Sequence, residues 1–319
     1  MKDYVIKKID DSSRDKIRYV SPIESNETIA KYISAFANTD GGVMVYGVKD
    51  DGNRLTIKNC SFEINEDKVR KYLDDDVEFE CGRFNYGKSQ LVYIYIHKSK
   101  ELIRADNIAY ELSSKNEAVP FTPKKVFLSY CENDCDIANI IQSKIENRLG
   151  HKVYVSRYTK DVKYKQSLSG FMQSIEEHDY VVSIISDKYL KSDGCMYEIS
   201  ELMRDRKYYD KLLFVILSEN DIFYYKSKVK VKDIKADVYS INRFKYIEYW
   251  KDKKKKIDGI VNIIADPSLA VEATEESKKI SIILLKIGEF IDKLKDGMGI
   301  RLREMIDTEF EDFINNILS

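Results

Sequence analysis

The stretch that decides the fold is Y-V-V-S-I-I-S at Tyr180–Ser186, followed closely by S-D-G-C-M-Y-E at Ser192–Glu198. The first part is apolar and of strand length, and the second part opens a helix. In an open α/β sheet, the loop after a strand and the start of the next helix lie at the carboxyl edge of the sheet, where such folds bind ligands. The sequence therefore predicts that Glu198 places a carboxylate at a ligand-binding edge.

Strands and helices alternate on both sides of this stretch. Further runs of strand length occur at Val126–Tyr130, Lys152–Val155, Lys211–Leu217 and Val238–Ile241. After the first run, Asp134 is a candidate helix N-cap and Gly150 a candidate helix end. Apolar residues recur between them at helical spacing: Ile137, Ile140, Ile141, Ile145 and Leu149. Strands that alternate with helices predict a parallel sheet with right-handed crossovers.

Three motifs of this segment resemble those of TIR domains. K-V-F-L-S-Y at Lys125–Tyr130 is similar to the first TIR box, and the run from Ser174 to Ser192 resembles the stretch that leads into the family's catalytic helix. S-D-G-C-M-Y-E resembles the family's S-x-W-C-x-x-E, with Gly194 in the place of the tryptophan. The resemblance implies a flavodoxin-like sheet of five parallel strands. In enzymatic members it also implies hydrolysis or cyclisation of NAD+ with release of nicotinamide.

The resemblance makes Glu198 the candidate catalytic residue. The bond from nicotinamide to ribose breaks through an oxocarbenium-like transition state, which one carboxylate can stabilise while it holds the ribose hydroxyls. Because nicotinamide leaves as a neutral group, no general acid is needed. We expect no metal and no cofactor, with NAD+ as the substrate. Glu201 lies nearly on the same helix face and is the alternative. Either glutamate could instead be a surface acid near a helix start.

Further substrate-binding candidates follow from the topology. Ser129 and Tyr130 end the first strand, while Arg157 and Tyr158 lie in the loop after the second strand, which corresponds to the family's BB-loop. An arginine can bind a pyrophosphate with two hydrogen bonds, and a tyrosine can stack on a base. The alternative for each is an ordinary loop residue. Cys195 is either a reactive thiol at a helix start or a residue that fills a packing position.

Two proline-containing stretches divide the chain into three parts. Ser113–Lys125 is polar and typical of a linker, and Pro267 begins another change of character. The predicted domains are residues 1–122, a small α+β domain, residues 123–267, the TIR-like domain, and residues 268–319, a C-terminal helical region. Two apolar stripes around Gly297-Met298-Gly299 predict a helical hairpin, which docks on its own chain or joins chains in an oligomer.

The first part contains a second family motif. Asn26 is a candidate N-cap of a helix, and strands are expected at Val43–Val48, Leu91–Ile96 and Ile108–Leu112. The run A-F-A-N-T-D-G-G-V-M-V-Y-G-V-K-D-D-G, which ends at Gly52, resembles the core motif of the Schlafen-type AlbA-like domain. Asn38–Gly42 is either an anion-binding loop or a tight turn from helix to strand. Nucleic acid or a nucleotide is therefore a candidate ligand of this domain.

The composition narrows the functional classes. Of 319 residues, 53 are Lys or Arg and 54 are Asp or Glu, so the net charge of -1 gives no overall attraction to nucleic acid or an anionic membrane. No apolar stretch reaches the roughly 18 residues of a membrane span, and the N-terminus lacks the apolar core of a signal peptide. Five cysteines without a CxxC pair or zinc-ligand spacing predict a reduced, cytoplasmic protein.

The leading functional hypothesis is a TIR enzyme that hydrolyses or cyclises NAD+, in a prokaryotic anti-phage effector that is activated by assembly. Self-association would involve the TIR domain and the C-terminal helices, and no membrane partner is expected. The retained Glu198 favours an enzyme, whereas Gly194 in place of tryptophan favours a non-catalytic TIR adaptor. A third hypothesis makes the first domain a nucleic-acid sensor that controls the TIR domain.

Overall fold

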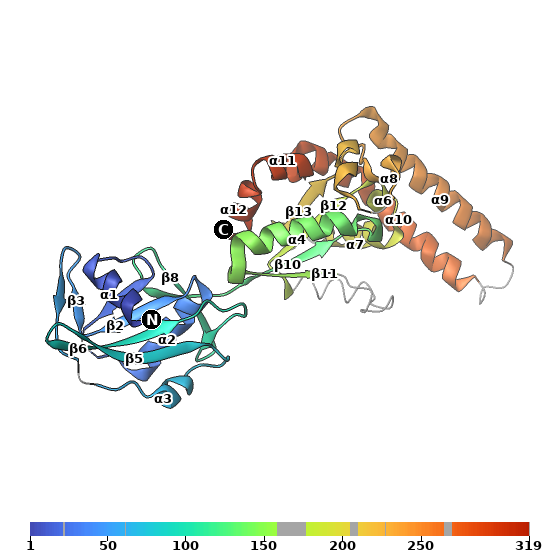
Figure 1. Cartoon of the computed structure of the whole chain (residues 1–319). Coiled ribbons are helices and arrows are strands. Elements are labelled where there is room, and N and C mark those ends of the chain that lie inside the picture. Colours follow the sequence, from blue (N-terminus) through green and yellow to red (C-terminus); the bar gives the residue numbers. More distant parts are fainter. Residues whose placement is uncertain are drawn as a thin grey trace. The chain divides into compact units, whose positions relative to one another are not determined.

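The chain folds as two compact units, Met1–Pro123 and Lys124–Ser319. A computed structural model describes residues 1–21, 23–60, 62–157, 177–204, 210–226, 228–264 and 270–318 (Figure 1). Each unit has its own apolar cores, so each is described by itself.

The first unit is an α+β domain built on a four-stranded sheet. Its strands follow the order β1-β2-β6-β5, with β1 and β2 parallel and the other neighbours antiparallel. These strands are β1 (Ile17–Val20), β2 (Gly42–Tyr46), β5 (Phe79–Tyr86) and β6 (Ser89–Ile96). Two smaller sheets pair β3 (Val48–Asp50) with β4 (Leu55–Ile57), and β8 (Ile108–Leu112) with β7 (Arg104–Ala105) and β9 (Ala118–Phe121).

Each face of this sheet is covered by one helix, and side chains that alternate along β2 pack against the two helices in turn. Val43 packs in the core with α1 (Lys2–Asp10), whereas Met44 packs with α2 (Asn26–Asn38). Successive strand side chains point to opposite faces, so a continuous apolar run serves both cores. The short helix α3 (Glu66–Arg70) contributes to the α2 side.

Two boundaries in the first unit differ from the prediction. The N-cap of α2 is Ser25, whose Oγ accepts a hydrogen bond from the Thr28 amide (3.2 Å), so Asn26 is the first residue inside the helix. The strand predicted to reach Val48 stops at Gly47, which has a φ of +92° and turns the chain into β3. The predicted helix and the other two strands are confirmed.

The second unit is an α/β domain with a sheet of five parallel strands. The strand order is β11-β10-β12-β13-β14, which confirms the predicted flavodoxin-like sheet. The strands are β10 (Lys124–Ser129), β11 (Val153–Arg157), β12 (Tyr180–Ile185), β13 (Leu212–Ile216) and β14 (Gly299–Arg301).

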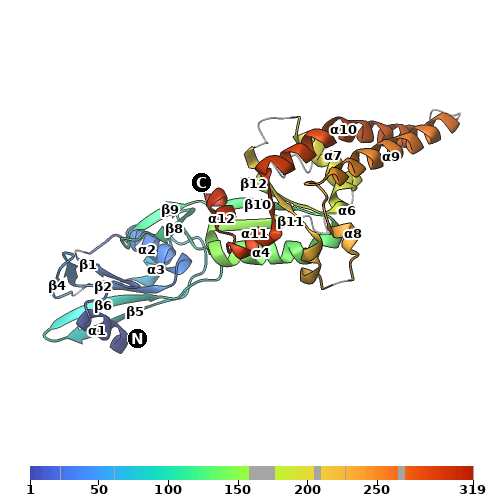
Figure 2. The same ribbon diagram turned by 90° about the horizontal axis from the view of Figure 1, so that it is seen from above.

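Helices cover both faces of this sheet (Figures 1 and 2). One face packs against α4 (Cys135–Leu149), α11 (Leu302–Asp307) and α12 (Glu311–Leu318). The other face packs against α6 (Asp187–Leu190), α7 (Asp193–Leu202), α9 (Phe244–Ile263) and α10 (Val271–Lys293). Helix α8 (Val231–Ile234) lies in the connection that follows β13.

The fifth strand is not the one that the sequence predicts. Val238–Ile241 forms no strand, because the Asp237 amide donates to the Tyr246 hydroxyl (3.0 Å) and directs this segment across the start of α9. The sheet edge is occupied by β14, which pairs with β13. Gly299 is required in β14, since a Cβ there would collide with the Ile216 side chain.

Residues 268–319 contribute both to the sheet and to its covering layers. The helical hairpin consists of α9 and α10, which lie side by side, rather than of two helices within this segment (Figure 2). The segment then returns through Leu294–Met298 to β14. Its apolar stripes are buried in the two cores of the unit: Ile280, Ile283, Ile287, Phe290, Leu302, Phe313 and Ile317. These helices therefore dock on their own chain.

Candidate active site

Glu198 lies on α7, close to the carboxyl edge of the sheet. The helix begins at its N-cap Ser192, whose Oγ accepts a hydrogen bond from the Cys195 amide (3.4 Å). Met196 and Ile199 are buried and fix the helix on the core, which leaves Glu198 half-buried. Because residues of a helix share a face at a spacing of three to four, the Glu198 carboxylate lies at the edge of the apolar face that Met196 and Ile199 turn to the core.

Within the part of the chain that the structure describes, the Glu198 carboxylate is set apart by its lack of a polar partner. No hydrogen bond or ion pair joins it to any residue that the structure describes. Burial raises its pKa to about 7, because removal from water disfavours the charged form. The alternative candidate Glu201 instead forms an ion pair with Arg204 (3.0 Å). Of the two glutamates, Glu198 is therefore the one that is free to act on a ligand.

Ser129 and Cys195 lie on the same side of the sheet as Glu198. Tyr189 is fully buried, and its hydroxyl lies 3.2 Å from the Ser129 Oγ. Burial raises the pKa of Tyr189, and the neighbouring Cys195 and Glu198 raise it further. These four side chains form one cluster between the end of β10 and the start of α7.

Tyr130 and Arg157 lie on the opposite face, beside α4. The Arg157 guanidinium donates to the Asn139 Oδ1 (2.6 Å) and the Ala138 carbonyl (3.2 Å). Burial raises the pKa of Tyr130, Cys135 adds to the rise and Arg157 opposes it. Because strand side chains alternate, Tyr130 points away from the face that Ser129 occupies. The predicted site residues are therefore divided between two faces, and Tyr158 lies outside the described residues.

Asp134 stands at the predicted N-cap position of α4, but its side chain does not cap the helix. It is 1% exposed and makes no capping hydrogen bond to α4. Its carboxylate accepts hydrogen bonds from the Ser186 Oγ (2.7 Å) and the Tyr225 hydroxyl (2.6 Å). Burial raises the pKa of Asp134 to about 6, and the two hydrogen bonds oppose the rise. The side chain thus joins the loop after β10 to the end of β12, which fixes the carboxyl edge.

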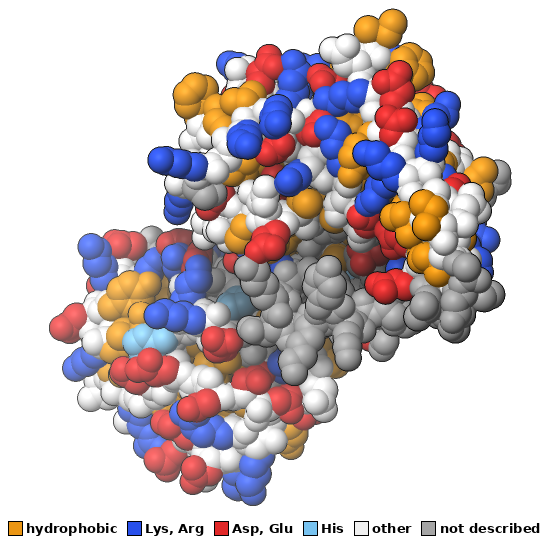
Figure 3. All heavy atoms as spheres, turned by 90° about the vertical axis from the view of Figure 1, so that its right-hand side faces the viewer, with side chains coloured by type: hydrophobic (Ala, Val, Ile, Leu, Met, Phe, Trp, Pro, Cys, Tyr) orange, Lys and Arg blue, Asp and Glu red, His pale blue; other side chains and the backbone are white. Residues whose placement is uncertain are grey.

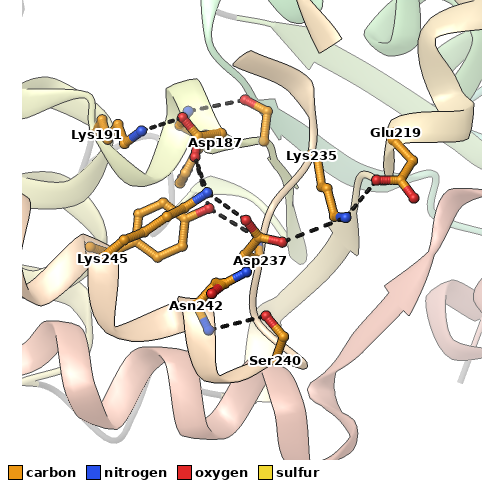
Figure 4. A network of polar contacts seen from close by, with 11 residues as sticks. Asp187, Lys191, Glu219, Lys235, Asp237, Ser240, Asn242 and Lys245 are labelled. Atoms are coloured by element: carbon orange, nitrogen blue, oxygen red, sulfur yellow. Dashed lines mark hydrogen bonds and ion pairs between the residues drawn. The ribbon is translucent and has the colours of Figure 1, made fainter. Parts of the chain in front are cut away.

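A second polar cluster anchors the segment that precedes α7 (Figure 4). The buried Asp187 carboxylate lies 2.6 Å from the Lys191 Nζ and 2.8 Å from the Lys245 Nζ, and it accepts a hydrogen bond from the Tyr246 hydroxyl (3.1 Å). Lys245 also pairs with Asp237 (2.6 Å). Since Lys245 and Tyr246 belong to α9, this cluster ties α6 to α9.

The position of the missing tryptophan is open. A Cβ added at Gly194 would meet no atom within 4 Å, so a side chain could stand there without a clash. Glycine at this position therefore removes an aromatic wall without any packing reason in the described residues.

A cavity lies on the α4 side. It has a volume of about 600 Å³, and Glu198 is not among its lining residues, which are Glu132, Asn133, Cys135, Asp136, Lys226, Lys228 and Val229. Glu132 and Asn133 follow β10 closely in the sequence. The sequence gives no sign of Lys226 and Lys228, because nothing in it places the segment after β13 beside α4.

In the first unit, Asn38–Gly42 forms a tight turn. The Asn38 side chain accepts from the Ile103 amide (2.8 Å) and donates to the carbonyls of Ile103 (2.7 Å) and Tyr110 (3.0 Å). A Cβ on Gly41 would lie 2.8 Å from a backbone oxygen of β6. The motif therefore ties α2 to the β7–β8 hairpin.

The described residues show neither a metal cluster nor a membrane span. Within the described ranges, no group of three or more His, Cys, Asp or Glu side chains is placed to hold a metal ion. No described helix has both the length and the apolar character needed to cross a membrane. On the face drawn in Figure 3, basic and acidic side chains are interspersed.

Comparisons with known proteins identify both units. A family model for the Schlafen AlbA_2 domain matches residues 7–119, and a model for the TIR domain matches residues 126–261. No curated protein matches. Among solved structures, the chain is similar to the TIR domains of the activated Roq1 resistosome that directly recognizes the pathogen effector XopQ. That match has 16% identity and a TM-score of 0.31, and it covers 61% of this chain and 97% of the other.

A second solved structure is the DIP2311 protein from Corynebacterium diphtheriae, with 15% identity and a TM-score of 0.29. The match covers 36% of this chain and spans only 25% of the DIP2311 chain. The two family models follow the same order as the α+β unit and the five-stranded parallel sheet. The chain therefore joins a Schlafen AlbA_2 domain to a TIR domain.

Proposed function

We propose that the TIR domain of this chain cleaves the bond between nicotinamide and ribose in NAD+, with Glu198 as the catalytic carboxylate. The observation that supports this proposal is the state of Glu198. It is half-buried on α7, has no partner among the described residues, and has a pKa raised to about 7. An unpaired and partly desolvated carboxylate is costly for the fold, which is typical of functional sites.

The proposed chemistry needs Glu198 in its ionised form. As the glycosidic bond breaks, positive charge develops on the ribose, and a nearby carboxylate stabilises it strongly in a partly water-excluded site. Nicotinamide departs as a neutral molecule. Attack on the ribosyl cation by water gives hydrolysis, and attack by the adenine ring of the same molecule gives cyclisation. The positive charge on the nicotinamide ring of bound NAD+ favours the ionised carboxylate and lowers the pKa of Glu198 from its value in the free protein.

We also propose that the protein acts in anti-phage defence and that assembly activates it. The AlbA_2 unit would receive the signal, with nucleic acid or a nucleotide as the candidate ligand. The predicted site residues are divided between the two faces of the TIR sheet. This division supports an active site that one copy of the chain does not complete by itself. The alternative function is a non-catalytic TIR adaptor, which the open position at Gly194 favours.

The experiment that tests the enzyme is NAD+ cleavage by the purified full chain over a range of protein concentrations, with nicotinamide and cyclic product measured. We expect Glu198→Gln to lower the rate by about 100-fold or more. Glu201→Gln, the matched control one helical turn away, should keep most of the activity. Below saturation, activity should rise with pH through about 7, as Glu198 of the free protein ionises.

Two results would contradict the proposal. If neither nicotinamide nor cyclic product forms at any protein concentration, the chain is not an NAD+-cleaving enzyme and the adaptor hypothesis is favoured. If Glu198→Gln cleaves NAD+ as fast as the unmodified chain, the assignment of the catalytic residue is wrong.

A further inference from the structure

The helix pair α9 and α10 continues beyond the layer that covers the TIR sheet (Figures 1 and 2). Trp250 is the last buried side chain of α9, and Ile280 is the first of α10. Residues 251–263 and 271–279, which we call the arm, contain no buried side chain. The two helices of the arm contact each other, and its outer surface faces solvent.

Charge is segregated along the arm. Its basic zone, residues 251–256 and 278–279, contains seven lysines and one aspartate, whereas its acidic zone, residues 257–263 and 271–277, contains four acidic residues and no Lys or Arg. Helical side chains lean toward the N-terminus of their helix. The lysines of α9 therefore lean toward the sheet, and the glutamates of α10 lean toward the far end of the arm.

Several of these charges are not neutralised within the chain. Lys254 does pair with Asp258 (2.7 Å), inside the arm. Four exposed side chains have no ion pair within the described ranges: Lys255, Lys256, Glu272 and Glu275. The arm thus presents unpaired positive charge in one zone and unpaired negative charge in the other.

The acidic zone also exposes apolar side chains. Ile260 is 45% exposed, Ile263 is 83% exposed and Val271 is 53% exposed. Lys256, Ile260 and Ile263 follow one stripe of α9, because they are spaced at i, i+4 and i+7. Apolar side chains gathered on one exposed element are typical of an interaction surface.

We propose that the arm is a docking surface for the arm of a second copy of this chain, with the two arms antiparallel about a two-fold axis. A two-fold interface uses the same surface on both copies, so that surface must be complementary to itself. Antiparallel arms meet this condition, since each acidic zone then lies against the basic zone of the other copy.

The paired arms would satisfy the charges and the apolar residues together. The methylene chains of Lys255 and Lys256 can cover Ile260 and Ile263 of the other copy while their ammonium groups reach its carboxylates. The thirteen residues of α9 in the arm allow an overlap of about 20 Å. A nucleic acid would be attracted to the lysines, but it would be repelled by the acidic zone and would leave the isoleucines exposed. The arm therefore fits a second copy better.

The base of the arm contacts the segment that leads to Glu198. The Trp250 Nε1 donates to the Leu190 carbonyl (3.0 Å), and the Tyr249 hydroxyl donates to the Lys191 carbonyl (3.2 Å), at the junction of α6 and α7. Pairing of the arms would thus connect the two α7 helices of a dimer. An effect of this pairing on activity rests on the proposed NAD+ cleavage.

Sedimentation velocity of the full chain over a range of protein concentrations tests the docking surface without any activity. We expect a dimer. Lys255→Glu with Lys256→Glu, and Glu272→Lys with Glu275→Lys, should each weaken it about 10-fold or more, because like charges then meet at two symmetric contacts. The chain with all four substitutions exchanges the two zones and should dimerise again, which excludes misfolding as the cause of the loss.

An apolar variant tests the same surface independently. Ile263→Asp should weaken the dimer about 10-fold or more, because it removes a large apolar side chain from the contact. Ile241→Asp is the matched control, since Ile241 is 78% exposed and lies outside the arm. It should dimerise like the unmodified chain.

Three results would overturn the inference. The first is a chain that is monomeric at every concentration, and the second is a dimer that the charge-reversed variants leave unchanged. The third is a monomer that binds a DNA duplex only when Lys255 and Lys256 are present, which would assign the basic zone to nucleic acid. A dimer that follows the charges of the arm in a chain that never cleaves NAD+ supports the inference and overturns only the proposed function.

Discussion

Glu198 and Glu201 show how two similar residues of one helix acquire different properties. Glu201 is neutralised by Arg204, whereas Glu198 lies against an apolar layer with no partner among the described residues. Sequence analysis could place both glutamates near the start of a helix. It could not choose between them on physical grounds, because their difference depends on which other elements contact each face of α7.

The raised pKa of Glu198 predicts how stability depends on pH. Its folded-state pKa of about 7 is above the ordinary value of 4.5, so the folded state holds its proton more tightly than the unfolded state does. Stability contributed by this group is therefore present below pH 4.5 and is lost as the pH rises toward 7. Glu198→Gln removes this penalty and should raise the free energy of unfolding by about 1–3 kcal/mol above pH 7.

Urea unfolding of both proteins at pH 4.5 and pH 8 measures this difference. The two curves should nearly coincide at pH 4.5 and separate at pH 8. Asp134 also has a raised pKa, but it is present in both proteins and cancels. Equal stability at pH 8 would show that the Glu198 carboxylate is well solvated or paired.

The turn after α2 carries the next prediction. Asn38 supplies hydrogen bonds to the amide and carbonyl of Ile103 and to the Tyr110 carbonyl. Removing the side chain leaves these part-buried backbone groups without partners, so Asn38→Ala should destabilise the first unit by about 2–4 kcal/mol. Hydrogen exchange at the Ile103 amide in the full chain measures the loss.

Asp40→Ala is the control within the same turn. Asp40 pairs with the lysines Lys16 (3.7 Å) and Lys98 (3.0 Å) at the surface, and such pairs contribute about 1 kcal/mol or less. If Asp40→Ala had the larger effect, the turn would not be held by Asn38.

Elements with a strong hydrophobic period were predictable, and short ones were not. Tyr180–Ser186 and the helix after β10 have the length and pattern from which a structure can be read. β14 is Gly-Ile-Arg, too short to show a period of two, whereas Val238–Ile241 has apolar residues at both ends but exposes Ile241. Which of these two segments becomes the fifth strand depends on pairing with β13 and on the bulk of Ile216. Both are set by residues that lie far away in the sequence.

At the level of the whole molecule, the TIR sheet needs residues beyond the match to the family model. That match ends at residue 261, but the second unit buries α10 in one core and α11 and α12 in the other. Burial of each large apolar side chain in these cores contributes about 1.5–3 kcal/mol. The loss of several such side chains together therefore exceeds the free energy of unfolding of a typical domain, which is about 5–15 kcal/mol.

We therefore predict that a chain ending after Ile264 does not form a stable second unit. Circular dichroism and urea unfolding should show no cooperative transition for that unit, whereas the full chain should show one. The variant Gly299→Val in the full chain is an independent probe, since its side chain would collide with Ile216 and displace β14. A cooperative transition of unchanged stability in the shortened chain would contradict the prediction.

The late position of β14 along the chain also affects how the protein is made. The AlbA_2 unit can fold while the rest of the chain is still being translated, because domains fold in order from the N-terminus. The TIR sheet cannot close its edge until the ribosome has passed Arg301, well after α7 has been synthesised. Until then β13 presents an unpaired edge, which favours pairing between nascent chains. Slow translation of the segment between β13 and β14 would therefore prolong the interval in which the protein is most prone to aggregate.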